Sequence, residues 1–120
     1  MSDFDSEVKA RWGDTLAYKQ SSERTSSYSA EDFAKAKADQ EAATEALLAC
    51  FIEGKDINSE EAKKAVLMHR EAITKWFYDC TPEMQKNLAL MYISDERFKK
   101  YYDDRSKGLA QFVHDAIFAQ

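Results

Sequence analysis

Cys80 is the residue of this 120-residue chain best suited to covalent chemistry. Thr81 and Pro82 follow it, and Thr is a favoured N-cap and Pro a favoured first helical residue, so a helix is predicted to begin at Pro82. The positive end of that helix favours the thiolate, the nucleophilic form of cysteine. Asp79 beside it opposes ionisation, however, and free cysteines are often simply buried apolar side chains. Both interpretations, a reactive thiol and a core residue, stay open at this point.

The remaining chemically active residue types do not form a recognisable catalytic or metal-binding pattern. Cys50, His69 and His114 have no spacing typical of a zinc site, and no Ser-His-Asp arrangement or glycine-rich phosphate loop is present. Cys50, between Leu47 and Phe51, is predicted to be a core residue. His69 falls on an otherwise apolar helix face, which favours a hydrogen-bonded core or cleft residue over a haem ligand. The sequence predicts neither an enzyme nor a bound metal or cofactor.

Charge and hydropathy exclude two classes of partner. The net charge is −5, and the basic pair Lys99-Lys100 is surrounded by acidic residues, so a phosphate-binding surface for nucleic acid is not expected. No apolar run is long enough to cross a membrane. Acidic residues stand where the positive segment of a signal peptide would lie, so a cytoplasmic location is expected.

The elements that must position these residues are all predicted to be helices. Apolar residues recur with helical spacing, no stretch alternates with period two, and glycine and proline are scarce. The expected helices run over about 2–12, 14–24, 29–53, 59–76, 82–93, 95–102 and 109–117. The first 28 residues have few apolar anchors, so 1–28 is interpreted as an arm or lid that is mobile without ligand, or as a docked helical hairpin. Residues 29–120 are predicted to be the helical core.

Aromatic residues gather near the expected helix ends and breaks, where they can line a groove with their polar tips facing solvent. Met84 adds an adaptable side chain to this set, although Met on a helical stripe is also ordinary packing. The predicted ligand-binding residues are Trp12, Tyr18, Tyr28, His69, Trp76, Phe77, Tyr78, Asp79, Met84, Tyr92 and Phe98.

Several short motifs, in this order and at this spacing, resemble the TipAS family, the drug-recognition domain of thiostrepton-induced MerR-type regulators. They are 11–15, 17–18, 27–29, 31–32, 69–70, 76–84, 90–98, 108–110 and 116–117. The resemblance implies a globin-like helical arrangement and an N-terminal part that folds over the ligand. It also implies that Cys80 adds to a dehydroalanine of a bound thiopeptide antibiotic.

Three roles therefore remain open from the sequence. The domain is expected to capture thiopeptides or other bulky apolar antibiotics, either as the effector domain of a regulator or as a free-standing sequestering protein. In a regulator, a MerR-type DNA-binding domain and RNA polymerase would be its partners. The alternative is a helical protein-protein interaction module without a small-molecule ligand.

Overall fold

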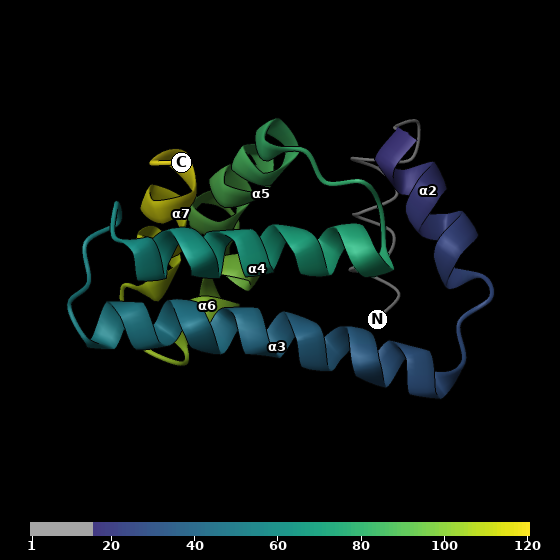
Figure 1. The fold of residues 1–120 in the computed structure, drawn as a ribbon, viewed down its shortest axis with the longest axis horizontal. Coiled ribbons are helices and arrows are strands. Elements are labelled where there is room, and N and C mark those ends of the chain that lie inside the picture. The colour runs from purple at the N-terminus through teal and green to yellow at the C-terminus, as the bar shows by residue number, and fades with distance from the viewer. Residues whose placement is uncertain (1–15) are drawn as a thin grey trace.

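A computed structural model describes residues 16–120, and every regular element in that range is an α-helix (Figure 1). The helices are α2 (Leu16–Thr25), α3 (Ala30–Ile52), α4 (Glu60–Trp76), α5 (Pro82–Ser94), α6 (Glu96–Asp103) and α7 (Leu109–Phe118). The all-α prediction is confirmed for this part of the chain. The expected helix over 2–12 and the proposed ligand residue Trp12 lie outside the described residues.

Four helices, α3 to α6, begin where the sequence predicts, because a side chain at each start satisfies a free backbone N–H. Ser29 and Asp32 form a reciprocal capping box at the start of α3. Ser59 accepts from the N–H of Ala62 in α4, and Thr81 accepts from that of Met84 in α5, with Pro82 in the first turn. Since Thr81 caps α5, Cys80 stands directly before a helix N-terminus, as expected.

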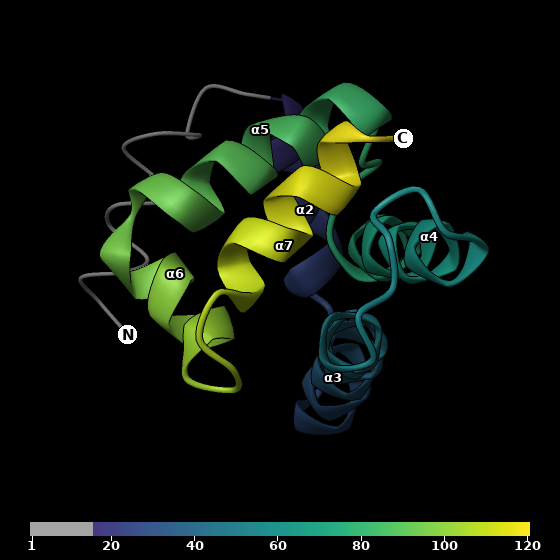
Figure 2. The same ribbon diagram turned by 90° about the vertical axis from the view of Figure 1, so that its left-hand side faces the viewer.

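The molecule has two packed layers. In one, α3 and α4 run antiparallel along the long axis (Figure 1), and in the other α5, α6 and α7 lie across them (Figure 2). The core between the layers contains large buried side chains from three helices, α3, α4 and α7: Leu47, Val66, Leu109, Val113 and Ile117. Cys50 is buried in this core, as predicted. The layers leave α2 at one end, beside the C-terminal end of α4.

The buried face of α5 differs from the expected one. The sequence predicts a stripe of Met84, Leu88 and Met91, but these three residues are only partly buried. The buried residues are Gln85, Ala89 and Tyr92, one position further along the chain. The apolar pattern could not distinguish these faces, because the buried face contains a glutamine.

Gly108 lies in the turn between α6 and α7, directly before the start of α7. Its φ of +94° is in the left-handed region, and a Cβ there would lie 3.3 Å from the ring of Phe51. Both the backbone conformation and the close contact therefore favour glycine. This turn directs α7 back into the core, where it packs against α5.

Candidate ligand-recognition site

The C-terminal end of α4 is held by side chains of α2. Arg24 donates to the carbonyl of Thr74 at 2.6 Å and forms an ion pair with Asp79 at 2.8 Å. Gln20 accepts from the N–H of Asp79 at 3.0 Å. The Arg24 hydrogen bond and charge hold the pKa of Asp79 below its usual range. These contacts fasten α2 to the segment that leads to Cys80.

An aromatic cluster lies on the same side of the molecule, where the turn after α2 meets α3 and α4. The ring of Tyr28 stands edge-on to Phe33 at 5.5 Å and to Trp76 at 5.7 Å, and its hydroxyl donates to the Trp76 carbonyl at 2.5 Å. The indole N–H of Trp76 donates to Asp39 at 2.7 Å, and this bond is the main reason that the pKa of Asp39 is lowered. Phe33 remains 46% exposed, so the cluster presents apolar surface to solvent.

Cys80 is buried, which agrees with the second of the two interpretations that the sequence left open. The helix N-terminus predicts a favoured thiolate, but burial raises the pKa of the Cys80 thiol to about 11, with Arg70 acting weakly in the opposite direction. The backbone N–H of Cys80 donates to the hydroxyl of Thr74 at 3.0 Å. Desolvation therefore outweighs the charge of Arg70, and in this conformation the sulfur is a thiol at pH 7.

Tyr78 and Tyr92 are electrostatically coupled to this sulfur. Burial raises the pKa of Tyr78, and the Cys80 sulfur adds to the shift. Burial also raises the pKa of Tyr92 well above its usual value, with Tyr102, Tyr78 and Cys80 contributing. Two predicted ligand residues thus share one low-dielectric region with the cysteine.

Next to this region, His69 and Tyr92 form part of a buried polar network. The Nε2 atom of His69 is 3.0 Å from the Tyr92 hydroxyl, and its Nδ1 atom is 2.9 Å from the side-chain nitrogen of Gln85. The same Gln85 nitrogen donates to the carbonyl of Val66 at 2.9 Å. Burial lowers the pKa of His69 to about 4, so the ring is neutral at pH 7. Both ring nitrogens already have partners, and neither is free to bond a ligand.

The other predicted site residues fall around these two centres. Phe98 lies 6.1 Å from the Tyr92 ring, and Tyr102 lies 4.9 Å from it on the same side of the core. Phe77, Met84 and Tyr18 are partly buried. The structure therefore separates the predicted set into an exposed or partly buried group (Tyr28, Trp76 and Asp79) and a second group in which His69, Cys80 and Tyr92 are buried and Tyr78 and Phe98 are partly buried.

Sequence reasoning missed four residues that organise these clusters: Arg24, Phe33, Asp39 and Gln85. For Gln85 a signal existed, since a polar residue shares the i, i+4, i+7 face of Ala89 and Tyr92. Arg24 and Asp39 act across long sequence separations, and nothing in their local pattern indicates a partner.

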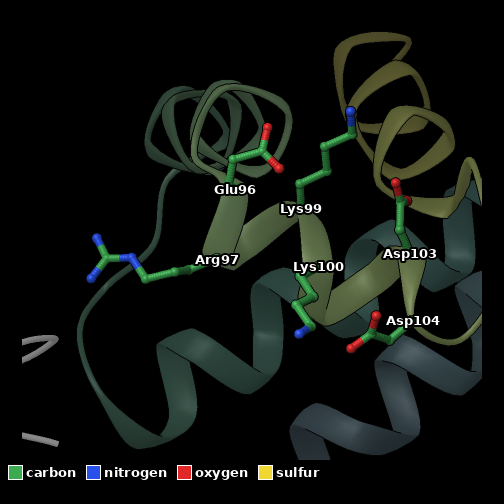
Figure 3. Close-up of a pocket in the computed structure, with 6 residues that line it drawn as sticks. All are labelled: Glu96, Arg97, Lys99, Lys100, Asp103 and Asp104. Atoms are coloured by element: carbon green, nitrogen blue, oxygen red, sulfur yellow. The ribbon is translucent and has the colours of Figure 1, made fainter.

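A separate surface depression lies over α6. Figure 3 shows its six charged side chains, which belong to α6 and the residue after it: Glu96, Arg97, Lys99, Lys100, Asp103 and Asp104. It contains neither the aromatic cluster nor Cys80. The depression carries three basic and three acidic side chains, and such a mixture is typical of a solvated helix surface.

Two further observations limit the chemistry of residues 16–120. Among them, no three His, Cys, Asp or Glu side chains are placed to hold a metal ion. None of the described helices is long and apolar enough to cross a membrane. The arrangement, a partly exposed aromatic cluster at the end of α4 and a buried cysteine a few residues further on in an all-α frame, fits a helical ligand-recognition domain.

Comparison with known proteins defines the family. The family model of the TipAS antibiotic-recognition domain matches residues 4–120 of this sequence. The HTH-type transcriptional activator TipA of Streptomyces coelicolor is 40% identical over 116 residues, which cover 97% of this chain and 46% of that protein. The HTH-type transcriptional activator mta of Bacillus subtilis is 33% identical over 111 residues, covering 92% of this chain and 42% of that protein.

The fold agrees with the sequence comparison. The solved structure of TipAS from Streptomyces lividans, in complex with nosiheptide, matches 98% of this chain and 82% of that one, with a TM-score of 0.88 and 40% identity. This chain belongs to the TipAS antibiotic-recognition domain family. It spans less than half the length of the curated relatives that it matches.

Proposed function

We propose that this domain binds thiopeptide antibiotics at the α2–α4 junction. The observation that carries the proposal is the match to Streptomyces lividans TipAS, because that protein was solved with the thiopeptide nosiheptide and the match covers 98% of this chain. The exposed ring of Phe33 and the Tyr28–Trp76 pair offer apolar area of the kind that bulky ligands bury.

The polar contacts of the junction suit a ligand that enters beneath α2. This helix is held to α4 mainly through the side chains of Arg24 and Gln20, and Tyr28 anchors the turn that follows. Polar contacts of partly exposed residues contribute little net stability each, so they can be exchanged at low cost. A ligand that lifts α2 and then packs under it would gain the aromatic contacts.

We also propose that Cys80 is the site of covalent capture for thiopeptides that contain dehydroalanine. The thiol loses its proton, the sulfur attacks the β-carbon of the alkene, and the π bond breaks as the α-carbon takes up a proton. A thioether forms, and no leaving group or oxidant is needed. Burial keeps the thiol protonated while α2 is packed against the end of α4. This step therefore requires that α2 moves away or that the ligand displaces side chains around the sulfur.

The domain acts by binding rather than by turnover. Its relatives are transcription activators rather than enzymes, and a thioether on Cys80 would consume the thiol without regenerating it. The role that fits best is the effector-binding part of a cytoplasmic HTH-type regulator. A free-standing sequestering protein would use the same site.

Isothermal titration calorimetry with nosiheptide tests the proposal. One ligand per chain and a clearly negative heat-capacity change are expected, because apolar surface is buried on binding. Trp76→Ala should abolish most of the heat, whereas Lys99→Ala, in the α6 depression, should leave it unchanged. Absence of binding heat at every temperature, together with an unchanged melting temperature, would reject the proposed function.

A further inference from the structure

The buried network of α4 and α5 has a defined hydrogen-bond direction, and it starts at Gln85. The side chains of Gln85 and His69 are 1% and 4% exposed, so water does not compete for their polar atoms. The Val66 carbonyl can only accept, so the Gln85 atom 2.9 Å from it must be the amide nitrogen. That constraint removes the usual uncertainty over which way a glutamine amide points.

The hydrogen-bond direction continues from Gln85 through the imidazole of His69. An amide nitrogen has no lone pair available to accept a hydrogen bond, so at 2.9 Å it must donate to His69 Nδ1. Nδ1 therefore carries no proton. Since the ring is neutral, its single proton lies on Nε2, which donates to the Tyr92 hydroxyl at 3.0 Å.

Tyr92 then has one direction left for its own hydrogen. Its oxygen accepts the hydrogen bond from His69 Nε2, so its own O–H points away from the imidazole. The Tyr92 ring is only 8% exposed and contacts Phe98 and Tyr102. The donors that link Gln85, His69 and Tyr92 are therefore assigned, and the opposite amide orientation would place the Gln85 oxygen 2.9 Å from the Val66 carbonyl oxygen, two acceptors facing each other.

We propose that Gln85 is a positioning residue that selects the Nε2–H tautomer of His69 and thereby fixes the orientation of Tyr92 in the core. This deepens the proposed function and rests on it where ligand affinity is concerned. If Tyr92 is already held in one orientation, ligand binding loses less conformational entropy, because Tyr92 and its neighbours need not rearrange when a ligand arrives. Gln85 itself touches no ligand in this scheme.

Nitrogen-15 NMR of the imidazole side chains tests the tautomer directly and requires no ligand. The chain contains two histidines, His69 and His114, so assignment is simple. His114 provides an internal reference for a protonated Nδ1, since its Nδ1 lies 2.8 Å from the Asp115 carboxylate and must donate to it. For His69 we expect an unprotonated Nδ1 and a protonated Nε2 at pH 7. A protonated Nδ1 on His69 in the wild type overturns the inference.

Three variants test whether Gln85 determines the tautomer of His69. Gln85→Met keeps the volume but removes the donor, so both tautomers should become populated. Gln85→Glu supplies an acceptor, so Nδ1 should become protonated. Tyr92→Phe is the matched control at the other end: Gln85 still donates, and Nδ1 should stay unprotonated. If Tyr92→Phe changes the tautomer and Gln85→Met does not, Tyr92 sets the network and the inference is wrong.

Affinity for nosiheptide gives the second measurement. Gln85→Met should bind about tenfold more weakly than the wild type, corresponding to roughly 1.4 kcal/mol, in samples shown by their spectra to be folded. Unchanged affinity despite a mixed tautomer would overturn the positioning role. Failure of the wild type to bind nosiheptide would instead count against the proposed function, and the tautomer result would stand by itself.

Discussion

The guanidinium of Arg24 lies 2.8 Å from the carboxylate of Asp79, and this ion pair joins α2 to the residue that precedes Cys80. The pair is partly exposed, with side-chain accessibilities of 32% and 66%. Arg24 also donates to the Thr74 carbonyl near the end of α4, where backbone acceptors lack helical partners. One side chain therefore neutralises a charge and caps a helix end.

Loss of Arg24 should loosen α2. A ten-residue helix is marginal without tertiary contacts, so Arg24→Gln is expected to raise amide exchange in residues 16–25 by about tenfold. Asp79→Asn should have a smaller effect, because it leaves the bond to Thr74 intact. Lys35→Gln, which removes an exposed pair with Glu31 on α3, is the control. Equal exchange in Arg24→Gln and the control would show that α2 is held by other contacts.

Acid should destabilise the fold through His69. The pKa of His69 is about 4 in the folded chain and about 6.5 when unfolded, so the unfolded state binds more protons between these values. The contribution of neutral His69 to the free energy of unfolding is therefore fully present above pH 6.5. It falls as the pH decreases, by about 1.4 kcal/mol per pH unit and about 3 kcal/mol in all by pH 4.

Urea denaturation at several pH values between 4 and 7.5 measures this loss. His114→Gln is the matched control and should retain it, whereas His69→Gln should show a much flatter profile at lower overall stability. A wild-type profile that is flat down to pH 4 would mean that protonated His69 is accommodated in the fold.

The elements were largely predictable from the sequence, and the site was predictable only in part. Ser29, Ser59, Thr81 and Asp95 each cap a helix by a local interaction of two or three residues, which a sequence pattern contains. The pairing of Arg24 with Asp79 spans 55 residues, and no local pattern indicates it.

The state of Cys80 shows a second limit. Its place before a helix N-terminus was predicted correctly, but the sequence left open whether the thiol is reactive or buried. Burial raises the pKa of the thiol, and burial arises from the packing of several helices rather than from a local sequence pattern. The predictions for residues 1–15, including Trp12, remain predictions.

Trp76 should be more important for ligand binding than any residue of the α6 depression. Trp76→Ala removes the ring that Tyr28 contacts and is expected to weaken nosiheptide binding by at least about 2 kcal/mol, against less than about 0.5 kcal/mol for Lys99→Ala. Tyr92→Ala should also weaken binding, but it opens the core as well. Melting temperatures must therefore accompany all three affinities, and equal losses of affinity would contradict the site assignment.

Cys80 should react slowly in the closed domain. Because the pKa of its thiol is about 11, alkylation by iodoacetamide near pH 8 should be slow and rise about tenfold per pH unit without a plateau. Cys80→Ser should retain nosiheptide affinity within about tenfold while losing any adduct with a dehydroalanine-containing thiopeptide. Intact-mass spectrometry measures both the alkylation and the antibiotic adduct. Cys50→Ser is the control that keeps the adduct. An adduct on Cys80→Ser would place the reaction elsewhere.

The most direct test of the account is a backbone NMR titration of the domain with nosiheptide. If the antibiotic binds at the α2–α4 junction, the largest shift changes will fall in residues 20–33 and 74–80, with small changes in 96–104. Saturation at one ligand per chain is expected. Changes confined to 96–104, or none at saturating antibiotic, would contradict the proposed site and function.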